Sequence, residues 1–298
     1  MLFHLNERHP LTMIDFRPIL EVLGMLIAIL AALMIFPFIA DILTDDTNWQ
    51  PFTAAGFLIA FIGGSLILSN RGYMESITNK QIVILTTLAW IVLPALAALP
   101  FKFTYSDMSY TDAFFEAMSG LTSCGASILD SIDDAPTGIL LWRALLNWVG
   151  GIGIIVVAMT ILPMLKVGGM QLFKTEASDK SDRILPRARQ LTNATMGIYV
   201  FMTIVSALCL WTAGMSGFDA LCHAMAAIAT GGFSNYNDSI GHFDNLAIEI
   251  IMMITMILGC LPFVLYIQMG QGRYIALWKD SHAKVVSITI CLLVIDSM

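Results

Sequence analysis

Long apolar segments alternate with short polar ones along almost the whole chain. A helix needs about 20 consecutive apolar residues to cross the hydrocarbon core of a bilayer. The pattern therefore predicts six membrane-spanning helices, with a kink expected at Pro37, and a seventh apolar run that begins at Val285. The six predicted spans are residues 19–42, 51–68, 81–99, 138–165, 191–214 and 246–269.

Two further apolar segments are too short to cross. Residues 111–122 would make a helix of roughly 18 Å, against a core of about 30 Å. This segment recurs: residues 112–127 and 219–234 share six of sixteen residues in register, at a constant offset of 107. Such an internal repeat is evidence about the architecture of the chain before it is evidence about function. A half-length apolar helix between spans is typical of a re-entrant unit, which stops near the middle and leaves as extended backbone.

The residues of this repeated unit suit a cation site. Asp112 and Asp219 are predicted to cap the first N–H groups of each half-length helix. The opposite helix ends carry partial negative charge, which favours a cation. Gly125 and Gly232 can adopt positive φ, so that successive carbonyls face one axis. Rings of such carbonyls replace the hydration shell of an alkali ion.

Composition excludes a water-soluble domain. The 298 residues are 57% hydrophobic and only 12% charged, whereas soluble domains have about 25% charged residues. Mean hydropathy is +0.79. The five cysteines have no metal-ligand spacing, and the net charge of −7 identifies no partner.

The positions of the basic residues predict the orientation. With a cytoplasmic N-terminus, 13 of the 15 lysines and arginines fall on the inner side, the exceptions being Lys102 and Arg143. Both short units then lie on the outer face. The acidic residues beside them could concentrate cations at a pore mouth, although for each single one an ordinary solvated loop is the favoured interpretation.

The repeat extends beyond the short units. In each copy a closing span ends in Leu-Pro, at Pro163 and at Pro262. These prolines follow Gly125 and Gly232 by 38 and 30 residues, which we interpret as a longer outer linker in the first copy.

Several residues admit more than one role. Gly150, Gly151 and Gly153 favour close helix packing over a hinge. His223 favours a structural polar contact over proton coupling. Arg143 is expected to extend toward the outer surface or to pair with an outer acid, and not to serve the pore.

The repeated units resemble the Trk/Ktr/HKT superfamily of potassium transporters, most closely its bacterial TrkH/TrkG type of membrane subunit. The resemblance is carried by Thr-Ser-Cys-Gly-Ala-Ser at 122–127, Ala-Thr-Gly-Gly-Phe-Ser at 229–234, Trp-Val-Gly-Gly-Ile-Gly-Ile-Ile at 148–155 and Gly-Gly-Met-Gln at 168–171. Either filter string alone would be weak evidence, whereas their combination is specific.

The resemblance implies an all-α polytopic protein in which four such repeats surround one pore in pseudo-fourfold fashion. The chain would then comprise an N-terminal helix pair (1–80), a first pore repeat with a cytoplasmic loop (81–190), a second repeat (191–282) and the start of a third (283–298). Four repeats need about twice this length, so a truncated sequence is expected, with dimerisation of two-repeat chains as the alternative.

The resemblance also implies the site and the partners. Backbone of eight residues would form half of a potassium filter: Thr122, Ser123, Cys124, Gly125, Ala229, Thr230, Gly231 and Gly232. In the family, glycine at position 125 goes with potassium preference and serine with sodium in some members, whereas Cys124 departs from the commoner Thr or Ser. K⁺ is the expected bound and transported ion, without a covalent cofactor. The expected setting is the bacterial inner membrane, with lipid and a second copy of the chain as partners and no nucleic acid. A nucleotide-binding TrkA-type subunit is expected to dock on loop 166–189, although the positive-inside bias by itself already explains the basic residues of that loop.

Two other functions remain open. A pore-loop chain could be a non-transporting assembly or regulatory subunit. An intramembrane protease is the other alternative, but Ser123 and Ser127 have only His223 and His242 as candidate bases. We therefore predict a transport protein and not an enzyme.

Overall fold

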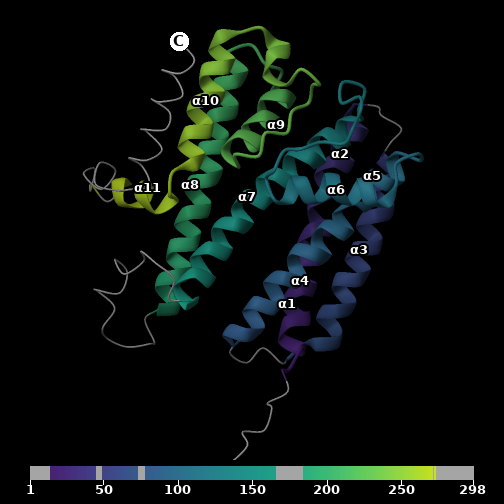
Figure 1. Cartoon of the computed structure of the whole chain (residues 1–298), viewed down its shortest axis with the longest axis vertical. Coiled ribbons are helices and arrows are strands. Elements are labelled where there is room, and N and C mark those ends of the chain that lie inside the picture. The colour runs from purple at the N-terminus through teal and green to yellow at the C-terminus, as the bar shows by residue number, and fades with distance from the viewer. Residues whose placement is uncertain (1–13, 45–48, 73–77, 166–183, 271, 273–298) are drawn as a thin grey trace, which may run out of the picture.

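The computed structural model describes residues 14–44, 49–72, 78–165, 184–270 and 272, and it confirms the all-α class (Figure 1). Within these residues every regular element is a helix. The predicted third repeat, 283–298, and most of loop 166–189 lie outside the described residues. Figure 1 shows α1–α6 on one side, α8–α11 on the other, and α7 between the two groups.

The N-terminal helices form a closely packed pair. Helix α1 (Arg17–Leu33) is followed by α2 (Ile35–Leu43), and together they make the first predicted span. The break at Met34 lies one turn before Pro37, whose ring disfavours a continuous helix there. Helix α3 (Trp49–Asn70) crosses α1 at Gly24 and Gly63. A Cβ on either glycine would lie 3.0 Å from the other's carbonyl oxygen, so the backbones touch as small residues in membranes allow.

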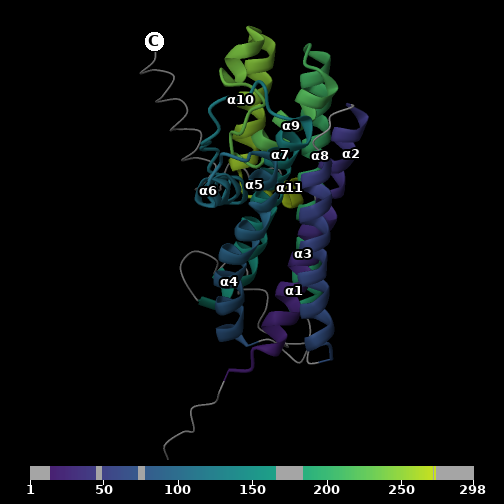
Figure 2. The ribbon, with the colours of Figure 1, turned by 90° about the vertical axis from the view of Figure 1, so that its right-hand side faces the viewer.

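The first unit consists of α4–α7. Helix α4 (Asn79–Ala97) begins with a capping box between Thr78 and Gln81, and α5 (Leu99–Thr104) extends the predicted third span beyond Pro100. Helix α6 (Tyr110–Leu121) is the first predicted half-length helix, with 12 residues. It runs crosswise to α4 (Figures 1 and 2). Helix α7 (Thr137–Leu165) continues for 29 residues.

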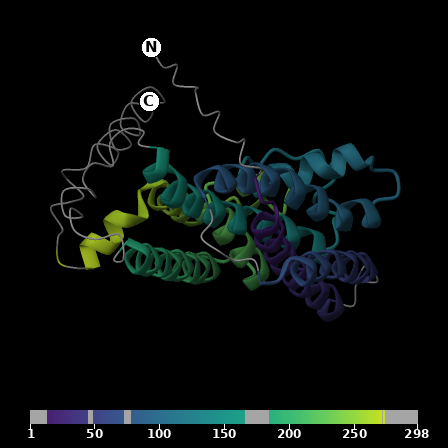
Figure 3. The ribbon, with the colours of Figure 1, turned by 90° about the horizontal axis from the view of Figure 1, so that it is seen from below.

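The second unit repeats this order. Helix α8 (Ile184–Thr212) begins earlier than the predicted span, and α9 (Gly217–Ile228) is again a 12-residue helix. A 3₁₀ turn, η3 (Ser239–Phe243), precedes α10 (Leu246–Cys260) and α11 (Phe263–Gly270). Viewed from below, α8 and α11 lie at one end of the molecule and α1 and α3 at the other (Figure 3).

Two predictions about the closing spans are wrong. The span 246–269 is not one helix, because α10 and α11 meet at 89° where Pro262 interrupts the hydrogen bonding. The first outer linker is also not the longer one. Helix α7 begins 12 positions after Gly125, whereas α10 begins 14 positions after Gly232. The prolines differ in spacing because Pro163 lies near the end of a long helix and Pro262 lies at a break.

The main core lies where α7 meets the N-terminal helices. Trp142 is fully buried, donates its indole N–H to Ala97 O at 3.1 Å, and packs edge-on to Phe52 with 6.2 Å between ring centroids. This packing fixes one face of α7 against α3 and α4. Helix α7 also contacts α6 and α9, the two half-length helices.

Four helical segments of the described residues are long and apolar enough to cross a membrane, and the bent α10–α11 pair brings the number to five when it is counted as one span. They are Arg17–Leu43, Trp49–Asn70, Lys80–Thr104 and Leu191–Thr212. Helix α7 covers the fourth predicted span. The chain is therefore a multi-pass helical membrane protein.

Candidate functional site

Both half-length helices begin with a serine cap. Ser109 Oγ accepts the N–H of Asp112 at 3.1 Å and donates to its carboxylate at 2.7 Å. Ser216 and Asp219 repeat this at 3.0 and 2.7 Å. The expectation that the aspartates are the caps is thus wrong: each aspartate lies in the first turn, where its charge favours the helix dipole, and the serine satisfies the free N–H.

Both half-length helices end in the same backbone motif. Cys124 N–H bonds Ser119 O and Ser123 N–H bonds Gly120 O, each at 2.9 Å. In the second copy Gly231 and Thr230 bond Ala226 O and Ala227 O at 2.9 and 3.0 Å. This is a Schellman motif, which needs a left-handed residue just after the helix and normally uses glycine.

Two residues in each following loop therefore have positive φ. We call residues 122–127 the first loop and residues 229–234 the second loop. Ser123 and Thr230 both have φ of 53°, and Gly125 and Gly232 have φ of 76° and 90°. The sequence indicated the two glycines, but it did not indicate Ser123 and Thr230. When left-handed backbone conformations alternate with right-handed or extended ones along a short loop, successive carbonyls point toward the same side.

The two loops lie against one another. A Cβ on Gly125 would overlap the carbonyl oxygen of Gly231, so the backbones touch directly. Of the eight predicted site residues, four are exposed (Thr122, Cys124, Thr230 and Gly232), two are half-buried (Ser123 and Gly125) and two are buried (Ala229 and Gly231). The structure thus brings both predicted segments to one place, with part of each backbone accessible.

Glycines of the closing spans pack on the ends of the half-length helices. A Cβ on Gly150 of α7 would overlap Leu121 O, and one on Gly259 of α10 would lie 2.6 Å from Ile228 O. Gly151 packs similarly against Ala229. The predicted close-packing role is therefore confirmed for Gly150 and Gly151, whereas none of the described residues lies within 4 Å of a Cβ on Gly153.

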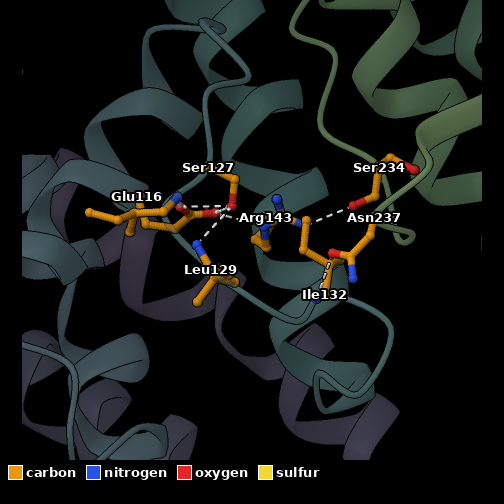
Figure 4. A network of polar contacts seen from close by, with 8 residues as sticks. Glu116, Ser127, Leu129, Ile132, Arg143, Ser234 and Asn237 are labelled. Atoms are coloured by element: carbon orange, nitrogen blue, oxygen red, sulfur yellow. Dashed lines mark hydrogen bonds and ion pairs between the residues drawn. The ribbon is translucent and has the colours of Figure 1, made fainter.

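A buried ion pair supports the first loop (Figure 4). Arg143 Nε lies 2.8 Å from Glu116 Oε1, with exposed fractions of 2% and 0% for the two side chains. Glu116 also accepts from Ser127 Oγ at 3.0 Å and from Ile128 N–H at 2.9 Å. The prediction that Arg143 extends outward or pairs with an outer acid is wrong, because its partner is on the half-length helix α6.

His223 makes the corresponding contact in the second copy. Its Nε2 lies 3.0 Å from Ser234 Oγ, and its Nδ1 lies 2.8 Å from Asp219 O. His223 and Ser234 occupy the positions of Glu116 and Ser127 after the offset of 107. The predicted structural polar contact of His223 is thus confirmed, and it ties the loop back to its helix.

Polar contacts also join the segments that follow the two loops. Asn237 bonds both carboxylate oxygens of Asp133, at 3.1 and 2.9 Å, and accepts from Ile132 N–H at 3.0 Å. Asp219 accepts from Asn235 at 2.9 Å and from Tyr236 Oη at 3.1 Å. Burial, followed by the Asp219 charge, raises the pKa of the Tyr236 phenol, so it remains a donor at neutral pH.

These features define a class: a polytopic helical membrane protein with repeated span–half-helix–span units whose glycine-bearing loops converge. The comparisons identify the family. The family model described as TrkH, a cation transport protein, matches residues 49–283. The chain belongs to this TrkH family.

Named relatives agree. The chain is 38% identical over 283 residues to the Trk system potassium uptake protein TrkI of Halomonas elongata, covering 93% of this chain and 57% of that protein. It is 37% identical over 288 residues to TrkH of Escherichia coli K12, covering 95% and 60%. The crystal structure of the potassium transporter TrkH from Vibrio parahaemolyticus matches with a TM-score of 0.83 at 33% identity, covering 95% and 58%. The chain thus spans less than two thirds of the length of these relatives.

Several functional residues were not predicted from the sequence. Ser109 and Ser216 could have been found from the Ser-x-x-Asp spacing that precedes each apolar run, which is typical of a capping box. Asn147, which is fully buried behind the loops, had no such signal, because a single asparagine within an apolar span indicates no partner.

Proposed function

We propose that this chain supplies two of the pore units of a potassium uptake protein and that it binds K⁺ through backbone carbonyls of residues 122–125 and 229–232. The observation that carries the proposal is the pair of loops with matching positive φ at 123/125 and 230/232, in contact through Gly125 and Gly231. The names of the relatives, which are potassium uptake proteins and a potassium transporter, support the choice of ion.

Carbonyl oxygens suit an alkali cation because they replace its hydration shell without covalent chemistry. The C-terminal ends of α6 and α9, with their partial negative charge, lie directly before the loops and favour a cation there. The proposal also includes two further units that complete a pseudo-fourfold pore, and a division of this chain after residues 80, 190 and 282. It places the protein in the inner membrane with a cytoplasmic N-terminus.

The test is growth at limiting potassium. The complete gene is expressed in a bacterium that lacks its own potassium uptake systems, and K⁺ influx is measured in the same cells. We expect growth and influx from the wild type and from Gly153→Ala, whose Cβ meets none of the described residues within 4 Å. Gly125→Ser should admit more Na⁺ relative to K⁺, because its Cβ displaces Gly231 O. Unchanged relative permeability would contradict the assigned site.

The same assay separates the alternatives. A non-transporting assembly subunit would give no influx even when the protein is present in the membrane. An intramembrane enzyme would need a nucleophile and a base, but His223 already bonds Ser234 and Ser127 bonds Glu116. Proteolysis that disappears in Ser127→Ala would favour the enzyme.

The proposed partners are a TrkA-type nucleotide-binding ring at loop 166–189 and a second copy of the protein. The family name and the basic character of the loop support the ring. Photo-crosslinkers placed along the loop should capture the ring when both are expressed together. Absence of crosslinks along the whole loop would contradict docking there. Native mass spectrometry of the complete protein would show whether it is a dimer.

A further inference from the structure

Two polar side chains of α7, Arg143 and Asn147, join the first unit to the second. They lie four residues apart, on one face of the helix, and their exposed fractions are 2% and 0%. Each one contacts a backbone or side-chain group of both units. This double role is distinct from forming the site, because neither residue belongs to the loops whose carbonyls face the proposed ion.

Arg143 makes the outer of these two links. Its Nε donates to Glu116 of the first half-length helix at 2.8 Å, and an Nη donates to Ser234 O of the second loop at 2.7 Å (Figure 4). The guanidinium also lies 4.3 Å from the centre of the Phe233 ring, within cation–π range. Only a forked, planar cation can make all three contacts at once.

Asn147 makes the inner link. In the orientation that satisfies both ends of its amide, it donates to Gly120 O at 2.9 Å and accepts from Phe233 N–H at 3.3 Å. The backbone carbonyl of Asn147 accepts a hydrogen bond from Ser123 Oγ at 3.3 Å. A Cβ on Gly231 would lie 2.5 Å from its side chain, so the amide also limits the approach of the second loop.

The described part of the second closing span, α10 and α11, has no equivalent pair. Gly150 and Gly259 rest on the same carbonyl of their respective half-length helices, which aligns α7 with α10. Counting seven and three residues back from Gly259 gives Met252 and Met256 where α7 has Arg143 and Asn147. Methionine offers no donor and only a weak acceptor, so the far side of the second unit has no such polar link from its own closing span.

We propose that Arg143 and Asn147 are positioning residues that fix the spacing between the first and second loops and thereby set the preference for K⁺ over Na⁺. The proposal rests on the proposed function. Carbonyls select between alkali ions by their number, direction and distance, so a shift of about 0.5 Å between neighbouring loops is sufficient to alter the preference. Among the described residues, it is the boundary between the first and second units that is braced in this way.

The test transfers the chemistry of the second unit into the first. Glu116→His with Arg143→Met reproduces the His223–Met252 combination, which this fold already accommodates, and leaves no buried charge unpaired. Ser127 can bond the new imidazole as Ser234 bonds His223. The tie to Ser234 O is lost, so we expect the K⁺/Na⁺ influx ratio to fall about tenfold, the factor that corresponds to one charge-assisted hydrogen bond.

Further variants separate positioning from general stability. Asn147→Met should lower the same ratio, and Arg143→Lys, which keeps the charge but not the fork, should give an intermediate value. Met252→Leu is the matched control on α10 and should leave the ratio unchanged. A double variant that reaches the membrane in normal amounts and keeps the wild-type ratio would overturn the proposal.

A second measurement does not depend on transport. Spin labels on non-natural amino acids at positions 130 and 238, both exposed, report the distance between the outer segments of the two units while the five cysteines remain. The distance distribution should be narrow in the wild type and in Met252→Leu and broad in the double variant. If the wild type carried no K⁺, the proposed function would be wrong. The spin-label distances would then still test whether Arg143 and Asn147 fix the spacing between the two loops. Equal widths would overturn it.

Discussion

In the first unit the half-length helix holds its loop through a carboxylate, and in the second through an imidazole. Glu116 and His223 stand at equivalent positions and bond Ser127 and Ser234, also equivalent, at 3.0 Å in each case. The carboxylate brings a charge into a buried site and therefore requires Arg143, whereas the neutral imidazole requires no counter-ion. The same loop geometry is thus achieved by two chemistries with different requirements from the closing span.

The closing spans differ accordingly. Helix α7 is continuous for 29 residues and carries the polar pair Arg143 and Asn147. Helix α10 ends after 15 residues at an 89° bend, and it carries methionines at the matching positions. The comparison teaches that duplicated backbones can be kept while the supporting side chains diverge, provided that each buried polar group keeps a partner.

The largest expected effect comes from removing the counter-ion. Arg143→Met leaves Glu116 buried and unpaired, and we expect a loss of about 3–5 kcal/mol in the free energy of unfolding. Met252→Leu, the matching change in α10, should cost less than about 1.5 kcal/mol. Denaturant unfolding of the purified protein in detergent measures both.

A second change sharpens the interpretation of this loss. Glu116→Gln added to Arg143→Met removes the unpaired charge and should recover most of the stability. If the single and the double variant unfolded at the same denaturant midpoint, the unpaired charge of Glu116 would not be the reason why Arg143→Met costs more stability than Met252→Leu.

The next effect concerns the glycines of the loops. Gly125→Ala combines positive φ with overlap on Gly231 O and should cost about 3 kcal/mol. Gly232→Ala has the same kind of backbone strain, but its Cβ meets none of the described residues within 4 Å, so a loss of about 1–2 kcal/mol is expected. Thermal unfolding in detergent compares them. Equal losses would mean that the two loops do not touch in solution.

Sequence reasoning was most successful where a physical constraint is local. Span length, the two half-length helices and the need for flexible backbone at Gly125 and Gly232 follow from hydrophobicity and from glycine itself. The partner of Arg143 did not follow, because Glu116 is 27 positions away and the pairing exists only after α6 and α7 cross. The bend at Pro262 was missed for a related reason: Pro163 lies inside a continuous helix, so a proline alone does not distinguish a break from a tolerated position.

A smaller effect is expected at the start of the half-length helices. Asp219 is 8% exposed and has Ser216, Asn235 and Tyr236 as donors, whereas Asp112 is half-buried and, among the described residues, bonds only Ser109, through exposed contacts. Asp219→Ala leaves these donors without their acceptor and should cost about 1–3 kcal/mol. Asp112→Ala should cost under about 1 kcal/mol, since water replaces the carboxylate. If Asp112→Ala lost more free energy of unfolding than Asp219→Ala in the same assay, the predicted order of these two aspartates would be contradicted.

The smallest effect tests the non-glycine residues with positive φ. Thr230→Gly should stabilise the protein slightly, by less than about 1 kcal/mol, because a β-branched residue is strained at φ of 53°. Ser123→Gly relieves less strain and loses the bond from Ser123 Oγ to Asn147 O, so it should lie within about 0.5 kcal/mol of the wild type. Both shifts are measured as melting temperatures under identical detergent conditions. If Ser123→Gly stabilised the protein more than Thr230→Gly did, the bond to Asn147 would have no stabilising role in the first loop.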